Sequence, residues 1–251
     1  MLPVLQLGPF AIQTYPLALV LAGWLALAVG ARAAKWLGLD GDHIYNAGLY
    51  GLLAGIIAGR LAHVLAFWPA YRSQPLEIFG FNTTAFLLWP AICGAVAVAG
   101  WYIYQRKLPL VALLDAFAPG LLTGLAVAAI GALLTGRNPG APANLPWSVT
   151  LWGIDRHPVQ AYEAIAFAAV AAYVLRLIRL GSHGGRPALI ALLGYGFTLW
   201  FVEAFRSTDV TATVLGGLRL GQVVGLGLAI AALLSLRYLS TRVKAVDRQG
   251  L

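Results

Sequence analysis

The sequence predicts an all-α integral membrane protein, a bundle of seven transmembrane helices with its N-terminus outside and its C-terminus in the cytoplasm. Of its 251 residues, 60% are hydrophobic and only 10% are charged, whereas soluble globular domains carry about 25% charged residues. The mean hydropathy is +0.80. The apolar residues also gather into runs of about 20, the length with which a helix crosses a bilayer.

Seven apolar runs have this length, and polar, glycine or proline residues separate them. No internal repeat or change of composition indicates a second domain, so we expect residues 1–251 to form a single membrane domain. The predicted spans are residues 15–34, 45–67, 87–104, 111–134, 161–180, 188–205 and 220–239.

Basic residues predict the orientation. Eleven of the 17 lysines and arginines lie on the side that holds the C-terminal tail and the connections after spans one, three and five. Five lie on the other side, and Arg60 lies within a span. The side that is rich in lysine and arginine normally faces the cytoplasm, which places the N-terminus outside.

Two outer connections are long enough to carry structure of their own. Residues 68–86 contain "EIFGFNTTA" and are expected to form an amphipathic segment at the outer surface. Residues 135–156 contain "GRNPGAPANLPW", whose Pro, Gly and Asn content predicts an irregular loop.

Charge and cysteine content exclude several classes of function. The net charge is +8, but the basic residues lie at the ends of apolar runs, which favours contact with anionic lipid headgroups over nucleic acid. One cysteine excludes an internal disulfide framework, and no Cys and His residues have the spacing of zinc ligands. We therefore expect no metal and no cofactor.

Polar side chains that are rare in membrane spans gather at one depth. An ionisable group at the centre of a span costs roughly 2.5 to 3.5 kcal/mol, so each one needs a partner, water or a function. Arg60 and His63 are spaced i and i+3 in the outer third of span two, and Glu203 and Arg206 have the same spacing at the outer end of span six. The other members of this outer set are Tyr15, Cys93, Arg137, His157, Gln160, Tyr162 and Glu163.

The outer set predicts a site that handles a polar group near the outer leaflet, but each member also has a structural interpretation. His157 and Pro158 are compatible with a helix cap at the interface, and Glu203 with Arg206 is compatible with an ion pair. Cys93 is compatible with a small packing residue, because a thiol in apolar surroundings is protonated and inert.

Six motifs in order resemble the phosphatidylglycerol:prolipoprotein diacylglyceryl transferases of bacterial inner membranes. The most specific is "RHPVQAYEA", which matches the HPxQxYE signature at His157, Gln160, Tyr162 and Glu163. The likeness covers nearly the whole chain and implies a multi-pass protein of the bacterial plasma membrane. The other five stretches are "LGPFAIQTYPLAL" at Tyr15, "AGRLAHVLAFW" at Arg60, "LLDAFAPG", "FVEAFRSTD" at Glu203 and Arg206, and "LRLGQVVGL" at Gln222.

The resemblance implies transfer of a diacylglyceryl group from a phospholipid such as phosphatidylglycerol to the lipobox cysteine thiol of a prolipoprotein signal peptide. The thiol must lose its proton to a base, and guanidinium groups should stabilise the charge that grows on the departing phosphate. From the outer set and the resemblance together, we expect the catalytic residues to be His157, Arg60, Arg206 and Tyr15, and the substrate-binding residues to be His63, Cys93, Arg137, Gln160, Tyr162, Glu163 and Glu203.

The sequence departs from the family pattern at five positions. Cys93 stands at a family His, Arg137 at a family Glu, and Leu199 at a family Arg. Ala129 and Ala132 stand where the family has an Arg and an Asn. Losing one donor to a developing anion costs about 2.7 to 4 kcal/mol of barrier, so these positions bear directly on activity.

Two alternatives stay open at this level. One is a catalytically inactive relative that binds lipid or helps to assemble a membrane complex. The other is a receptor, pump or transporter with seven helices. A retinal protein needs a lysine within a span, whereas Lys35, Lys107 and Lys244 lie at inner edges, and the broken helices of transporters are not indicated.

Overall fold

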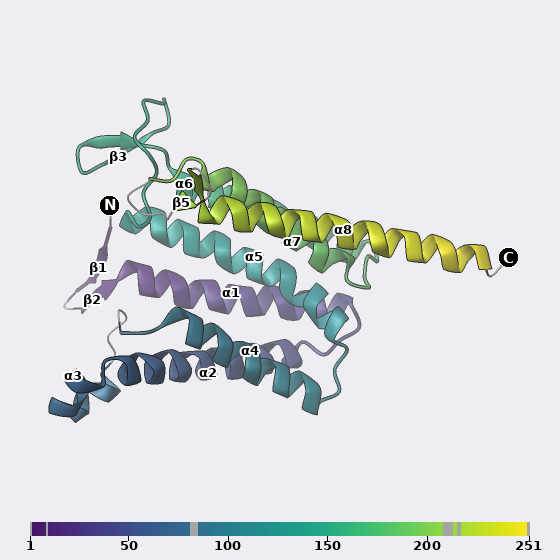
Figure 1. Ribbon diagram of the computed structural model, residues 1–251, viewed down its shortest axis with the longest axis horizontal. Helices are drawn as coiled ribbons and strands as arrows, with labels where there is room; N and C mark the ends of the chain where they lie inside the picture. Colours follow the sequence, from purple (N-terminus) through teal and green to yellow (C-terminus); the bar gives the residue numbers. More distant parts are fainter. Residues whose placement is uncertain (1, 9, 81–84, 208–212, 215–216, 250–251) are drawn as a thin grey trace. The chain divides into compact units, whose positions relative to one another are not determined.

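The computed structural model describes residues 2–8, 10–80, 85–207, 213–214 and 217–249. These residues form eight α-helices, one short 3-10 helix and three two-stranded antiparallel hairpins (Figure 1). The chain divides into two compact units, each described here by itself. One comprises Met1–Gly41 with Val111–Leu251, and the other comprises Asp42–Leu110.

The larger unit contains five long helices, each of which coincides with a predicted span. The helix of the last span continues beyond the predicted end at residue 239, and Figure 1 shows it extending past α7. The helices are α1 (Thr14–Trp36), α5 (Leu110–Thr135), α6 (Val159–Arg179), α7 (Arg186–Glu203) and α8 (Leu220–Gln249).

Three hairpins that the sequence did not predict lie before α1, between α5 and α6, and between α7 and α8. The second hairpin corrects the expectation of an irregular loop over residues 135–156, because part of that loop is paired strand. Its turn holds Trp152 and Gly153 at φ values of 53° and 78°, the left-handed conformation of a tight hairpin turn. The strand pairs are β1 (Val4–Leu7) with β2 (Phe10–Gln13), β3 (Val149–Leu151) with β4 (Ile154–Arg156), and β5 (Thr213–Val214) with β6 (Leu218–Arg219).

The smaller unit is a helical pair with a structured connection. Helices α2 (Asp42–Ala66) and α4 (Leu88–Gln105) pack side by side. Between them lie α3 (Trp68–Ser73) and the 3-10 helix η1 (Pro75–Phe79), within the segment for which surface structure was expected.

Five helices are long and apolar enough to cross a membrane: α1, α2, α5, α6 and the first part of α8. The prediction of a helical integral membrane protein is therefore confirmed. The two remaining predicted spans form α4 and α7, which have 18 residues each. Helix α7 begins with Arg186 and ends with Glu203, so its apolar stretch is shorter than the helix itself.

Small residues let the helices approach closely within each unit. In the smaller unit, Gly51, Gly55 and Gly59 of α2 face alanines of α4. In the larger unit, Gly120 and Gly124 of α5 face the backbone of α1. Lipid offers no hydrophobic drive between helices, so such van der Waals contact and interhelical hydrogen bonds hold a membrane bundle together.

Asp115 is such a hydrogen-bonding residue and fixes α7 against α5. Its side chain is fully buried. One carboxylate oxygen accepts the N–H of Gly185 at 2.8 Å, and the other accepts the N–H of Ala188 at 2.9 Å. The carboxylate thus satisfies backbone donors at the start of α7, where a negative charge is favourable.

Candidate functional site

The loop that follows α5 brings the ends of α6 and α7 together. Ala141 donates its N–H to the carbonyl of Phe205 at 2.8 Å, and its own carbonyl accepts the N–H of His157 at 3.0 Å. A Cβ atom at Gly140 would collide with the backbone of His157, so this close approach requires glycine. The loop therefore sets the position of His157 relative to the end of α7.

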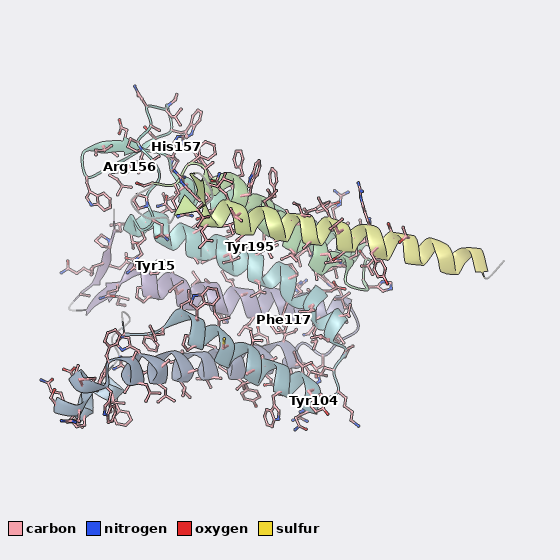
Figure 2. All side chains as sticks on the ribbon, in the orientation of Figure 1. Tyr15, Tyr104, Phe117, Arg156, His157 and Tyr195 are labelled. Carbon is pink, nitrogen blue, oxygen red and sulfur yellow. The ribbon has the colours of Figure 1, made fainter. Side chains whose placement is uncertain are left out.

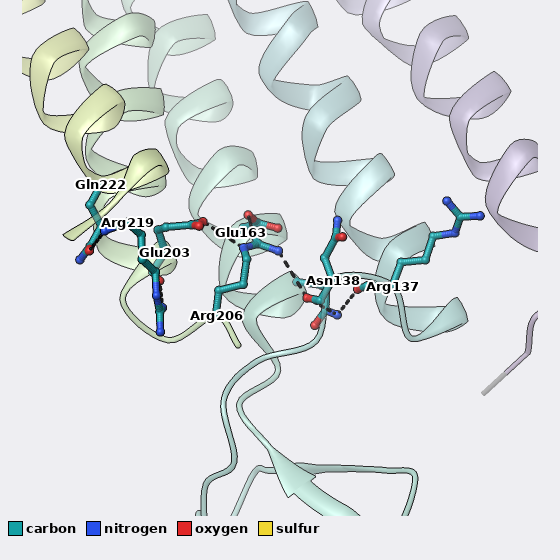
Figure 3. A network of polar contacts seen from close by, with 8 residues as sticks. Arg137, Asn138, Glu163, Glu203, Arg206, Arg219 and Gln222 are labelled. Atoms are coloured by element: carbon teal, nitrogen blue, oxygen red, sulfur yellow. Dashed lines mark hydrogen bonds and ion pairs between the residues drawn. The ribbon is translucent and has the colours of Figure 1, made fainter. Parts of the chain in front are cut away.

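A buried charged network lies beside this loop (Figure 3). Arg206 donates from Nε to Glu203 Oε2 at 3.0 Å and from Nη2 to Glu163 Oε1. Its Nη1 donates to the carbonyl of Asn138 at 3.3 Å. The side chains of Arg206, Glu163 and Glu203 are 10%, 17% and 6% exposed. One guanidinium group thus holds two carboxylates out of water.

A second arginine extends the network from the start of α8. Arg219 donates from its guanidinium group to the backbone carbonyl of Glu203. The backbone N–H of Arg219 donates to the side-chain oxygen of Gln222 at 3.0 Å. The described network accordingly contains two carboxylates, on α6 and α7, and two guanidinium groups, from the segment after α7 and from β6.

Gln160 holds the backbone next to Arg137. Its side-chain amide is buried and donates to the carbonyls of Arg137 at 2.5 Å and Asn138 at 3.1 Å. The exposed Arg137 side chain turns away from Arg206 (Figure 3), and its guanidinium carbon lies 4.3 Å from the centre of the Tyr15 ring. Arg137 is therefore a cation stacked on an aromatic face.

His157 and Tyr162 form a third polar contact. Trp147 donates its indole N–H to the Tyr162 hydroxyl at 2.8 Å, and that hydroxyl lies 3.4 Å from Nδ1 of His157. An indole N–H can only donate, so the Tyr162 oxygen accepts from Trp147 and its own proton is free to point to His157. The His157 ring also packs against Phe205, with ring centres 5.0 Å apart.

Figure 2 labels Tyr15 at the start of α1 and His157 at the start of α6, at the same end of the larger unit. The structure thus gathers eight of the predicted site residues around the α5 loop and the helix ends that it contacts. They are Tyr15, Arg137, His157, Gln160, Tyr162, Glu163, Glu203 and Arg206.

The other three predicted residues belong to the smaller unit. Arg60 lies 5.4 Å from the centre of the Tyr71 ring, and the Tyr71 hydroxyl lies 3.2 Å from Nδ1 of His63. Cys93 lies on α4 with an exposed side chain. The Arg60 guanidinium group donates to three backbone carbonyls, those of Glu77, Ile78 and Ala85. Arg60 therefore anchors the connection between α2 and α4, an engagement that the sequence did not reveal.

Comparison with known proteins decides the family. A sequence model of the family described as prolipoprotein diacylglyceryl transferase matches residues 3–238. The chain belongs to this family. The resemblance seen in the motifs is thus confirmed, and the chain is a membrane transferase of this kind rather than an unrelated receptor or transporter.

Relatives named phosphatidylglycerol--prolipoprotein diacylglyceryl transferase match over most of their length. That of Polynucleobacter necessarius is 30% identical over 234 residues, 87% of each chain. That of Paracidovorax citrulli is 29% identical over 251 residues, 92% of each chain. That of Synechococcus elongatus is 26% identical over 240 residues, 89% of this chain and 82% of its own.

The structure also places the positions where this transferase departs from the family pattern. Ala129 and Ala132 are buried in α5, at 7% and 6% exposure, so no polar group extends from either position. Leu199 is partly buried in α7. At the two remaining departures a polar or charged side chain is exposed, the thiol of Cys93 and the guanidinium group of Arg137.

Sequence reasoning missed three residues of these polar contacts. Arg219 and Gly221 lie in the "LRLGQ" stretch that was matched only through its glutamine, and Trp147 lies in "NLPW". A Cβ atom on Gly221 would lie 2.9 Å from the carboxyl carbon of Glu203, so glycine makes room for that carboxylate. For Arg219 and Gly221, the available signal was their place within this matched stretch.

The described residues contain no group of three or more His, Cys, Asp or Glu side chains that could hold a metal ion.

Proposed function

We propose that this protein transfers a diacylglyceryl group from phosphatidylglycerol to the lipobox cysteine of a prolipoprotein at the outer face of the bacterial inner membrane. The observation that carries the proposal is the family match over residues 3–238, joined to the polar network at Arg206 that the matched motifs form. The motifs and the network together favour an enzyme over an inactive relative.

The proposed topology has seven crossings of one membrane domain, with α4 and α7 completing the five clear spans and the N-terminus outside. The excess of basic residues on the opposite side supports this orientation. The guanidinium carbons of Arg32 and Arg179 lie 5.6 and 4.3 Å from the Trp36 ring, which supports placing these ends of α1 and α6 at a membrane interface. Such aromatic and cationic groups gather at membrane interfaces.

The reaction forms a bond between the cysteine sulfur and a glycerol carbon and breaks the bond between that carbon and a phosphate oxygen. Glycerol phosphate leaves with the electron pair, and the thiol proton passes to a base. We assign the base to His157 acting through Tyr162: Nδ1 takes the phenol proton that points to it, and the phenol oxygen takes the thiol proton. Tyr15 and Tyr162 are assigned to positioning the headgroup and the thiol.

The balance of charge around Arg206 differs from that around Arg137. Arg206 is compensated by both Glu163 and Glu203, so an added phosphate there must compete with two carboxylates. No described side chain pairs with the guanidinium group of Arg137, which stacks on Tyr15 and is exposed. We therefore assign the phosphate contact to Arg137, with Arg206 shaping the site behind it. Arg60, which donates to three carbonyls, is assigned to holding the outer connection of the smaller unit.

The test is lipidation by the purified full chain. Labelled phosphatidylglycerol and a lipobox peptide should give lipidated peptide and an equal amount of glycerol phosphate. The variants Arg137→Gln, His157→Ala and Arg206→Ala should each lose most of this activity. Arg72→Gln is a matched control, because Arg72 is an exposed arginine outside both polar clusters.

Complementation of a bacterial strain depleted of its own transferase provides the second readout. Growth with the unmodified chain and failure with the His157 variant are expected. A folded protein that neither lipidates the peptide nor restores growth would refute the proposal and leave the inactive, lipid-binding relative as the function.

A further inference from the structure

A groove with two chemically different ends surrounds the start of α7 in the larger unit. One part has a volume of about 690 Å³ and is lined by the loop before α7 and by the last membrane turns of α8. The next part, of about 540 Å³, continues toward the start of α5. Both parts share Gly184 and Leu239, so they form one continuous depression at the end of the unit opposite to the Arg206 network.

The first part of the groove has a largely apolar lining that also carries a positive charge. Arg186 and His183 line it together with Ser182 and Ser240. The His183 Nδ1 donates to the carbonyl of Gly181 at 2.7 Å, which leaves its Nε2 for another partner. No described residue accepts a hydrogen bond from the exposed guanidinium group of Arg186, which lies at the mouth of the groove.

Two glycines give the loop before α7 its left-handed turns. Gly181 and Gly184 adopt φ values of 86° and 72°, and a Cβ atom at either position would meet nothing within 4 Å. The backbone donors of Gly185 and Ala188 are already taken by Asp115. An anion at this place would therefore be recognised by side chains rather than by the N-terminus of the helix.

The second part of the groove is apolar. Val111, Leu114 and Leu189 form one wall, and Leu234 and Tyr238 form the other. A cationic mouth that leads to an aliphatic wall matches a molecule with an anionic head and hydrocarbon tails. In the proposed orientation, the mouth lies at the inner leaflet, where anionic lipids meet the basic side of the protein.

We propose that this groove binds one anionic phospholipid of the inner leaflet, with its phosphate at Arg186 and His183 and its acyl chains along α8. The site is separate from the place of diacylglyceryl transfer, since its residues belong to the other ends of α6, α7 and α8. It rests on the proposed orientation of the helices but does not depend on transferase activity.

The test uses the full chain, freed of lipid in detergent, and counts bound lipids by native mass spectrometry. Phosphatidylserine is the probe, because it is anionic but is not the proposed diacylglyceryl donor. One molecule should bind more tightly than phosphatidylcholine. Arg186→Gln should weaken this binding about five- to tenfold, the value of one cation beside a lipid phosphate. Arg176→Gln is the matched control, because Arg176 is exposed on the same side but does not line the groove.

Position is tested with phosphatidylserine that carries a photoactivatable acyl chain. Crosslinks should map to α8 and the first turns of α7, and should fall in the Arg186 variant. Three outcomes would overturn the proposal: equal binding of phosphatidylcholine, equal weakening in the Arg176 variant, or crosslinks confined to the helix ends around Arg206. Formation of a dimer through the groove, without bound lipid, would also overturn it.

Discussion

Replacing Arg206 by methionine should destabilise the protein strongly, because the carboxylates of Glu163 and Glu203 would lose their cationic partner. The side chains of Glu163 and Glu203 are only 17% and 6% exposed and share the Arg206 guanidinium group. Removing one partner of a buried ion pair costs about 3–5 kcal/mol, since an uncompensated charge stays behind. At roughly 2–4 °C per kcal/mol for a chain of this size, Tm should fall by about 6–20 °C in thermal unfolding followed by circular dichroism.

A compensating variant separates this cost from function. Adding Glu163→Gln and Glu203→Gln to Arg206→Met removes both stranded charges, so most of the lost Tm should return while lipidation stays absent. Arg72→Met, at an exposed arginine, should change Tm by no more than about 2 °C. If Arg206→Met lowers Tm by less than about 2 °C, the two carboxylates are solvated and the argument for a buried network is wrong.

Three further predictions concern residues that orient the site or its scaffold. Trp147→Phe retains an aromatic ring but removes the indole N–H that donates to Tyr162. Loss of this hydrogen bond, worth about 1 kcal/mol, should lower kcat/KM for lipidation about fivefold. Equal rates would show that the bond does not orient the phenol. Gly221→Ala places a methyl group 2.9 Å from the carboxyl carbon of Glu203, so it should lower both activity and Tm, the latter by a few degrees for about 1–3 kcal/mol of overpacking. Asp115→Asn leaves one of two backbone donors at the start of α7 without its acceptor, and a destabilisation of about 1–3 kcal/mol is expected in thermal melts; an unchanged Tm would mean that the cap is not needed.

The close sequence spacing of two residues was enough to predict one contact of the site. Arg206 follows Glu203, the last residue of α7, by three positions, and the ion pair expected as one interpretation is present at 3.0 Å. The pairing of Arg206 with Glu163 joins residues 43 apart in sequence, and it depends on the register of the loop after α5. No periodicity within either helix contains that information.

Short hairpins and Arg60 escaped prediction for a related physical reason. Strands of two to four residues are too short to show an alternating pattern, and their pairing is set by the ends of the helices that they join. The sequence predicts an anion ligand at Arg60, because the resemblance implies it and because a charge within a span demands an explanation. The structure supplies three backbone carbonyls for it, a partner type that every residue carries and that no sequence motif marks.

The arginine at position 137, where the resemblance implies a glutamate, is explained by the charges at the other positions that depart from the family. A glutamate there, as the resemblance implies for the family, would place an anion where this chain has a cation stacked on Tyr15, and the resemblance also implies two arginines on the helices. This chain has Ala129 and Leu199 where those arginines are expected, and Arg137 where the glutamate is expected. Loss of two cations and reversal of one anion leave the net charge of this set of positions the same. A site that must attract a phospholipid phosphate can therefore keep its overall attraction while moving the cation from the helices to the loop, above Tyr15.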